Sequence, residues 1–318
     1  MRNPPRTAEP ELAAGGPAAS ATAAAPIGRS DPGRKGTGIR RRTGKRVPLV
    51  LAVPFGILYA IFFVGPLVYA LLESLQSPLT GGFAGTMNYE TAAGSADFWS
   101  SMVQMSLFTV VQVAVMLSLA LALALLLDSK YCRGKSAFSI IYFLPYAVPG
   151  VIAAIMWAFI LSPQTDSLLR AANASPLESG GVFYVILTIV TWEWTGYNIT
   201  LFLAGLTSIP AAVVDAARLD GCGEFRLAWH IKLKMLRPII AFTCFASLIG
   251  TFQLFNEPDV INFIHPLPAN YTPNLLIYNT AFRFGNIPLA SAESMILAAL
   301  TIGAALVFTL LARRRNRT

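Results

Sequence analysis

Six long apolar segments limit what this chain can fold into more than any other feature of its sequence. A helix needs about 20 mainly apolar residues to cross a bilayer, and these segments meet that length. Backbone polar groups find no water in the hydrocarbon layer, so such segments cross it as helices. The sequence therefore predicts an all-α, polytopic membrane protein. The six predicted transmembrane helices are residues 47–72, 101–127, 136–161, 181–209, 238–256 and 289–312.

The composition supports this class. Of the 318 residues, 55% are hydrophobic and only 13% are charged, whereas about 25% are charged in ordinary soluble domains. A net charge of +8 would also suit a nucleic-acid-binding protein. The basic residues flank the apolar segments, however, as they do when they set membrane topology. We therefore predict contact with a lipid bilayer and no nucleic-acid partner.

The basic residues also predict the orientation of the chain. Loops on the cytoplasmic side of a membrane carry an excess of Lys and Arg. Of the 24 Lys and Arg residues, 22 fall in segments that the six spans place on one side, and only Arg170 and Arg283 fall in the other loops. Both chain ends are therefore predicted to be cytoplasmic. The basic segments are 1–46, 128–135, 210–237 and 313–318.

The ends of the chain lack the composition of a folded domain. Residues 1–46 are rich in Ala, Pro, Gly and Arg and have few large apolar side chains. Such a segment cannot bury a core, so we predict a disordered cytoplasmic tail. Residues 47–312 form the predicted transmembrane domain, in which 47–72 is a retained helix rather than a signal peptide. Residues 313–318 form a basic cytoplasmic C-terminus.

The loop 207–237 has the pattern of two helices joined by a sharp turn. Ser208 is a suitable N-cap and Pro210 suits a first turn, so a short helix is predicted to end near Gly221. A second helix is predicted from Glu224 to Leu236. The residues alone leave two interpretations open. The loop is either an amphipathic segment lying on anionic lipid or a surface on which another protein docks.

The spacing within this loop resembles a known motif. "DAARLDG", nine residues and then "IKL" is similar to the loop of ABC importer permease subunits, which reads Glu-Ala-Ala, three residues, Gly, nine residues, Ile-x-Leu-Pro. This sequence departs from it at two positions, with Asp215 in place of Glu and Lys234 in place of Pro. The flanking stretches "WTGYNITLFLAGLTSIP" and "FQLFNEPDVI" resemble the carbohydrate-importer branch, of the maltose and glycerol-phosphate type.

The resemblance covers about residues 47–312 and implies a fold, a function and partners. The fold would be that of a type I ABC importer permease, in the plasma membrane of a prokaryote. The chain would form half of the path for a sugar or a related polyol or oligosaccharide. The implied partners are a second homologous permease, two ATPase subunits and an external solute-binding protein. ATP hydrolysis would occur in the ATPase subunits, so the chain itself would not be an enzyme, and it has no phosphate-binding loop of its own.

In this family the loop enters a groove on the ATPase and couples it to the membrane helices. The coupling residues implied by the match are Asp215, Ala216, Ala217, Arg218, Asp220, Gly221, Ile231 and Leu233.

Polar residues within the predicted spans suggest a solute path. Glu193 is the one ionisable residue deep in a span, where such residues usually face a cavity or a partner. Tyr197 lies four residues further on and shares its helix face. Aromatic rings and hydrogen-bonding groups suit sugars. The candidate path residues are Thr191, Glu193, Trp194, Tyr197, Asn198, Gln253 and Asn256.

Other interpretations of these polar residues remain open. Glu193 and its neighbours would lie at a helix–helix contact if they have only a structural role. A stand-alone secondary transporter would use Glu193 as a proton relay. We expect Trp192 to pack against lipid or a neighbouring helix, Glu293 to be interfacial, and His265 to have no special role.

No other catalytic chemistry is indicated. The three Cys are scattered and the chain has two His, so neither a metal site nor a cofactor is predicted. The same scarcity argues against a membrane enzyme.

Overall fold

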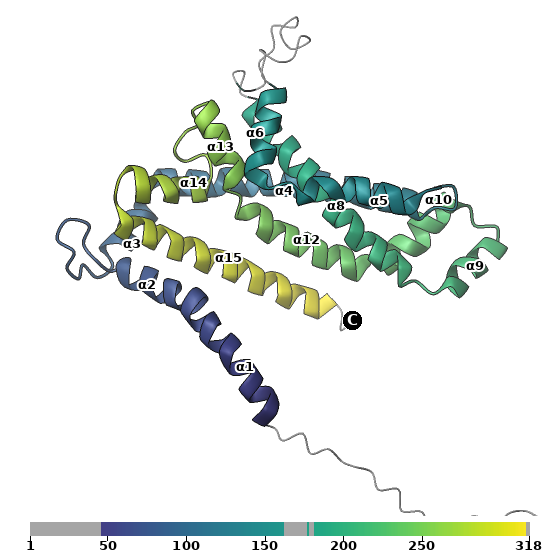
Figure 1. Cartoon of the computed structure of the whole chain (residues 1–318), viewed down its shortest axis with the longest axis horizontal. Helices are drawn as coiled ribbons and strands as arrows, with labels where there is room; N and C mark the ends of the chain where they lie inside the picture. Colours follow the sequence, from purple (N-terminus) through teal and green to yellow (C-terminus); the bar gives the residue numbers. More distant parts are fainter. Residues whose placement is uncertain (1–45, 162–176, 178–180, 316–318) are drawn as a thin grey trace, which may run out of the picture. The chain divides into compact units, whose positions relative to one another are not determined.

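The computed structural model describes residues 46–161, 177 and 181–315, and all secondary structure there is helical apart from one isolated bridge between Gln76 and Phe83 (Figure 1). This confirms the all-α class. The predicted tail lies outside the described residues except for Arg46. Contacts divide the chain into the units Met1–Phe55 and Gly56–Thr318, and the packing described below lies within the second unit.

The predicted number of transmembrane helices agrees with the structure. Four helices are long and apolar enough to cross a membrane, and two bent pairs raise the number to as many as six within the described residues. The four are Ala52–Glu73, Ala96–Asp128, Arg237–Ile264 and Ile287–Leu310, and the bent pairs are Lys135–Ala147 with Gly150–Ile160 and Val182–Thr207 with Ala211–Leu219.

A proline interrupts the regular hydrogen bonding of the first span. The span runs through α1 (Arg46–Tyr59), the π-helical turn η1 (Ala60–Val64) and α2 (Gly65–Glu73). Pro66 follows the π turn and has no N–H to donate. The Gly65 N–H bonds to the Ala60 carbonyl oxygen, five residues back, which is the bond of a π turn.

The third span is bent, which corrects the prediction of one continuous helix over 136–161. It consists of α5 (Lys135–Phe143), the 3-10 turn η2 (Leu144–Ala147) and α6 (Gly150–Ile160), with an angle of 96° across the break. A proline disfavours the helical conformation in the residue before it. Val148, which precedes Pro149, is accordingly extended, with ψ 127°.

Helix α8 (Val182–Thr207) is the central helix of the second unit. It packs along α4 (Ala96–Asp128) and also contacts α5, α6 and α12 (Arg237–Phe252). Gly196 permits the contact with α5, because a Cβ at this position would overlap the carbonyl oxygen of Tyr142. Two apolar clusters surround α8. One centres on Ile186 and Ile189, and the other lies toward its C-terminal end around Phe202.

The fifth span extends further than the predicted 238–256. After α12 the chain continues as α13 (Asn256–Ile264), which packs on α6. The stretch "EPDVINFI", predicted to begin an outer loop, is therefore helical. His265 ends this helix, and its N–H bonds to the Ile261 carbonyl oxygen.

The remaining helices gather around the last span. Helix α15 (Ile287–Arg315) follows α14 (Pro273–Tyr278) and the π turn η4 (Asn279–Arg283), and it contacts α2 and α3 (Met87–Gly94). Glu293 of α15 is only 3% exposed, and α15 packs against η4. The prediction that Glu293 is interfacial is therefore wrong, because η4 folds back over it.

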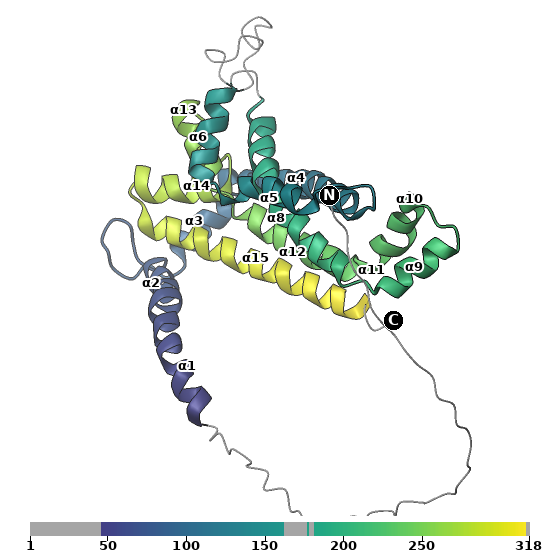
Figure 2. The same ribbon diagram turned by 45° about the vertical axis from the view of Figure 1, so that its right-hand side comes forward.

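The second unit has two distinct ends. Helices α9 (Ala211–Leu219) and α10 (Glu224–Leu227) lie at one end of α8, and α6 and α13 lie near the other end in both views (Figures 1 and 2). The loop and the helices α6 and α13 therefore lie toward opposite ends of α8.

Replacing Gly196 by Ala should separate α8 from α5. We expect the overlap with the Tyr142 carbonyl to destabilise the protein by about 1–3 kcal/mol, seen as a lower Tm of the purified chain in detergent. Gly303→Ala is the matched control, since nothing lies within 4 Å of a Cβ there. That variant should be neutral or stabilised by about 0.5–1 kcal/mol. Equal Tm changes in both variants would contradict the close contact.

Candidate functional site

The loop after α8 begins with a proline-fixed corner. Pro210 precedes α9 in an extended conformation (φ −58°, ψ 129°), and its ring presets the chain for the first turn. Ser208 does not cap α9. Its hydroxyl instead donates 2.7 Å to the Gly205 carbonyl oxygen at the end of α8, so the prediction of an N-cap at Ser208 is wrong.

A glycine turn ends α9. Gly221 has φ +77°, a conformation that side chains with a Cβ rarely adopt. The Cys222 N–H bonds to the Ala217 carbonyl oxygen and the Gly221 N–H to that of Arg218, both at 3.0 Å, as in a helix C-cap. No atom lies within 4 Å of a Cβ built on Gly221, so backbone conformation rather than contact within this chain requires glycine there.

The second half of the loop forms the predicted helical segment. It runs through α10, the π turn η3 (Ala228–Lys232) and α11 (Leu233–Met235). Leu227 and Leu236 are fully buried and anchor the segment to the bundle. Ile231 and Leu233 are half-buried, and Lys234 is exposed. The two apolar motif residues therefore also contribute to the anchoring.

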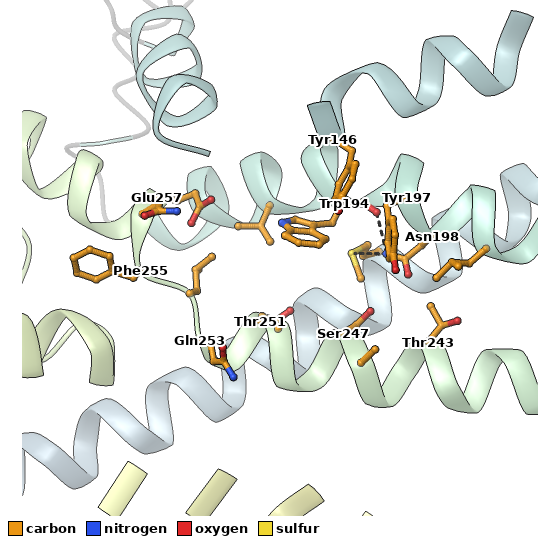
Figure 3. A pocket seen from close by; sticks show the side chains of 17 residues that line it. Tyr146, Trp194, Tyr197, Asn198, Thr243, Ser247, Thr251, Gln253, Phe255 and Glu257 are labelled. Atoms are coloured by element: carbon orange, nitrogen blue, oxygen red, sulfur yellow. Dashed lines mark hydrogen bonds between the residues drawn. The ribbon is translucent and has the colours of Figure 1, made fainter. Parts of the chain in front are cut away.

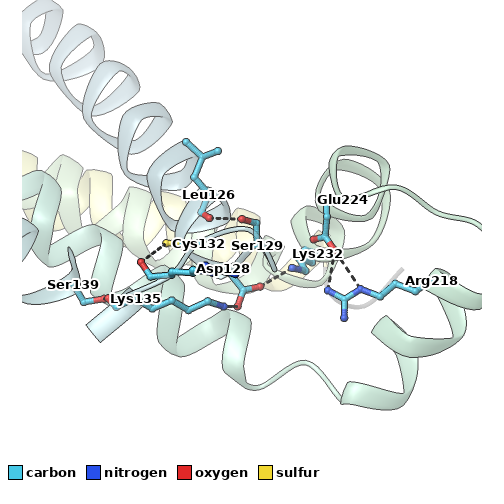
Figure 4. A network of polar contacts seen from close by, with 10 residues as sticks. Leu126, Asp128, Ser129, Cys132, Lys135, Ser139, Arg218, Glu224 and Lys232 are labelled. Atoms are coloured by element: carbon cyan, nitrogen blue, oxygen red, sulfur yellow. Dashed lines mark hydrogen bonds and ion pairs between the residues drawn. The ribbon is translucent and has the colours of Figure 1, made fainter. Parts of the chain in front are cut away.

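Two ion pairs tie the loop together and to the bundle (Figure 4). Arg218 Nη2 of α9 lies 2.9 Å from Glu224 Oε1 of α10, across the turn. Lys232 Nζ lies 2.6 Å from Asp128 Oδ2 at the end of α4, and the Lys232 side chain is only 6% exposed. The sequence prediction did not include Lys232, because its partner lies 104 residues away.

One face of the loop is uncovered. Asp215, Ala216 and Asp220 are exposed, whereas Ala217 packs inward. Leu219 and Phe225 are 89% and 84% exposed, although both are large and apolar. An exposed patch that combines apolar and charged side chains is typical of a protein interface.

A cavity of about 480 Å³ opens between α8, α12 and the start of α13 (Figure 3). Three aromatic rings form one wall. Tyr146 of η2 stacks on Tyr197, with centroids 5.0 Å apart, and meets Trp194 edge-on at 5.3 Å. Asn198 of α8 lies beside these rings, and further polar groups line the cavity from α12, α13 and the turn between them. They are Thr243, Ser247, Thr251, Gln253, Asn256 and Glu257.

Buried hydrogen bonds support the cavity wall. The Thr251 hydroxyl of α12 donates 2.9 Å to Gln112 Oε1 of α4, and both side chains are buried. Asn198 Nδ2 donates 2.9 Å to the Trp194 carbonyl oxygen. These bonds fix the wall residues because an unpaired buried polar group is costly.

The structure brings most of the candidate path residues together. Trp194, Tyr197, Asn198, Gln253 and Asn256 line the cavity, whereas Thr191 and Glu193 do not. Glu193 lies where α8 contacts α6 and α13, close to the carboxyl group of Glu257. Trp192 packs edge-on against Trp157 at 5.8 Å, as expected for a contact with a neighbouring helix.

Sequence reasoning missed several cavity residues for identifiable reasons. Tyr146 enters the cavity only because the third span bends at η2. Glu257 lies just beyond the predicted span 238–256. Thr251 and Ser247 lie within that span, and nothing in the local sequence distinguishes them from other small polar residues there. Among the described residues, no group of three or more His, Cys, Asp or Glu side chains could hold a metal ion.

A family model described as "Binding-protein-dependent transport system inner membrane component" matches residues 120–317. The chain belongs to this family. It is therefore a permease subunit of an ABC importer, in the inner membrane, and it works with an external binding protein and an ATPase rather than as an enzyme itself. This assignment favours the importer over the stand-alone secondary transporter.

Individual relatives agree with the family. The permease is 32% identical over 241 residues to the lactose transport system permease protein of Rhizobium radiobacter, covering 71% of this chain and 80% of that one. It is 30% identical to the sn-glycerol-3-phosphate transport system permease protein of Rhizobium meliloti (81% and 92% covered). It is 27% identical to the arabinooligosaccharides transport system permease protein of Bacillus subtilis (80% and 84% covered).

A solved structure confirms the permease fold. A chain of a bacterial ABC transporter involved in the import of the acidic polysaccharide alginate superposes with a TM-score of 0.73 at 20% identity, covering 85% of this permease and 96% of that chain. The same transporter has been solved with a periplasmic protein bound to an alginate pentasaccharide (TM-score 0.74).

Removing the Lys232 ammonium should loosen the loop. Lys232→Met leaves the partly buried Asp128 carboxylate with only the more distant Lys135, at 4.0 Å, as a partner, which we expect to destabilise the permease by about 1–3 kcal/mol. The double variant Asp128→Asn/Lys232→Met removes both charges and should recover part of the loss. The interaction energy of the pair follows from the Tm values of four proteins: the unchanged chain, Lys232→Met, Asp128→Asn and the double variant. Fully additive losses would contradict a direct interaction.

Proposed function

We propose that this permease forms one half of the path for a sugar or a related polyol or oligosaccharide, and that the loop 207–237 transmits ATP-driven movement to it. The other half would be a second, homologous permease. Two ATPase subunits and an external solute-binding protein would complete the importer. The chain ends and the loop would face the cytoplasm, as the distribution of Lys and Arg favours.

The main support for a sugar-like solute comes from the residues that line the cavity. Three aromatic rings lie opposite hydroxyl and amide side chains. Sugars present apolar C–H faces, which pack on aromatic rings, and hydroxyl groups, which hydrogen-bond to polar side chains. Relatives named for lactose and arabinooligosaccharides support the same class. Ligand sites commonly combine a largely apolar wall with a few polar groups in this way.

The position of the loop supports the coupling role. Helix α9 follows α8 directly, and α11 leads into α12, so the loop joins the two helices that form opposite walls of the cavity. The Arg218–Glu224 and Lys232–Asp128 pairs make the loop a unit attached to α4. A force applied at α9 would therefore reach the cavity walls. Importers of this kind require such a two-state movement of packed helices.

Replacing Tyr197 by Leu tests the solute path. We expect the variant to lower kcat/KM for solute uptake by the assembled importer about tenfold, because losing a ring contact costs about 1 kcal/mol or more. Solute binding by the external protein should not change. Tyr184→Leu is the matched control, since Tyr184 lies on the same helix but is exposed and outside the cavity. Equal uptake by both variants would argue against a path at Tyr197.

Replacing Leu219 by Asp tests the docking surface. The exposed side chain makes little packing within this chain, so folding and Tm should be unaffected. At an interface the lost apolar burial is about 1.5–3 kcal/mol, and a tagged variant should retain about tenfold less ATPase on purification. Leu79→Asp serves as the control, because Leu79 is equally exposed and lies outside the loop. Undiminished ATPase retention by the Leu219 variant would exclude this surface.

A further inference from the structure

Two buried carboxyl groups meet where α6, α8 and α13 pack together. Glu193 of α8 is 6% exposed and Glu257 of α13 is 4% exposed, and their carboxyl groups lie beside the same point on the backbone, at Gly150. Gly150 at the start of α6 leaves the space they occupy. A Cβ there would lie 2.5 Å from Glu257 Oε1 and 3.4 Å from Glu193 Oε1.

Two like charges this close together and shielded from water repel each other strongly. The pair is therefore expected to carry one negative charge rather than two. Glu257 is the better place for the negative charge. It lies in the first turn of the nine-residue helix α13, where the helix dipole favours a negative charge. Glu193 Oε2, by contrast, has no hydrogen-bond partner among the described residues.

Glu257 brings this charge to the cavity. It lines the cavity at the opposite end from Tyr197 (Figure 3). Among the residues that the structure describes, 17 line the cavity, and none of these is Lys, Arg or His. An anionic solute would therefore meet a like charge without a compensating cation, in surroundings where water screens charge poorly. An uncharged solute would instead donate hydroxyl hydrogen bonds to the carboxylate.

We propose that Glu257 makes this half of the path selective for uncharged polyhydroxy solutes over anionic ones, an inference that rests on the proposed function. Glu193 and the space at Gly150 position the Glu257 side chain. Glu257 is the specificity residue and Glu193 a positioning residue. The family alone does not decide this, because several relatives are named for sn-glycerol 3-phosphate and the similar structures belong to importers of the acidic polysaccharide alginate.

The test measures selectivity in the assembled importer reconstituted in proteoliposomes. The probes are a neutral oligosaccharide and the corresponding uronic acid, in which a carboxylate replaces one hydroxymethyl group. Each is supplied at the concentration that half-saturates the external binding protein, so that differences in that protein cancel. The readout is the ratio of anionic to neutral uptake. We expect the unchanged importer to favour the neutral solute by about tenfold or more, as repulsion over a few ångströms implies.

Two variants separate charge from structure. Glu193→Gln keeps an amide donor for Glu257 and keeps the negative charge, so the uptake ratio should stay within about twofold of the unchanged importer. Glu193→Gln/Glu257→Gln removes the charge while an amide–amide hydrogen bond remains possible, and it should raise the relative uptake of the anion about tenfold. Glu90→Gln, an exposed acid outside the cavity, controls for net charge.

The possible outcomes are distinguishable. Equal uptake of both probes by the unchanged importer would overturn the inference and leave the proposed function standing. If the double variant has the same ratio of anionic to neutral uptake as the unchanged importer, the inference is likewise overturned and the proposed function still stands. If the double variant does not assemble, the ratio in the unchanged importer and in Glu257→Gln, which moves the charge away from the cavity lining, decides the same question. An importer that assembles with its partners but carries neither probe would overturn the proposed function and this inference together.

Discussion

The close contact of α8 with α5 at Gly196 is the constraint on which the rest of the second unit depends. Because no Cβ separates Gly196 from the Tyr142 carbonyl, the two backbones approach directly. That approach places η2, which follows α5, against the face of α8 that carries Trp194 and Tyr197. Small residues let membrane helices pack in this way, where the hydrophobic effect gives little drive to associate.

The same helix joins the two candidate functional regions. Helix α8 carries one wall of the cavity and continues through Pro210 into α9. Helix α12 carries the opposite wall and begins directly after α11. The loop is thus a single connection between the two walls, held at an additional point by Asp128 of α4. Pushing on this connection moves the walls together with α4 rather than bending the loop alone, which is what transmission over a distance requires.

The sequence was sufficient to predict features that depend on residue type and local spacing. Apolar length predicted the spans, and the Gly221 turn and the second loop helix followed from local rules. Features that depend on contacts between distant residues were not predictable. Lys232 appears as a solvated base in the sequence, and only its pairing with Asp128 shows that it is buried. Glu257 appears as a loop residue, since the continuation of α12 into α13 depends on packing against α6. Glu293 was misjudged for the same reason, because the fold of η4 covers it.

The uncovered apolar tip of the loop also bears on how the importer is made. Leu219 and Phe225 remain in water as long as no partner covers them. Exposed apolar patches of this kind promote aggregation and attract proteases and chaperones. If the ATPase covers this tip, as we propose, a cell that made the permease in excess of the ATPase would carry a surplus of aggregation-prone chains. Because the tip stays exposed until a partner covers it, the cell needs either balanced synthesis of the subunits or rapid degradation of unassembled permease.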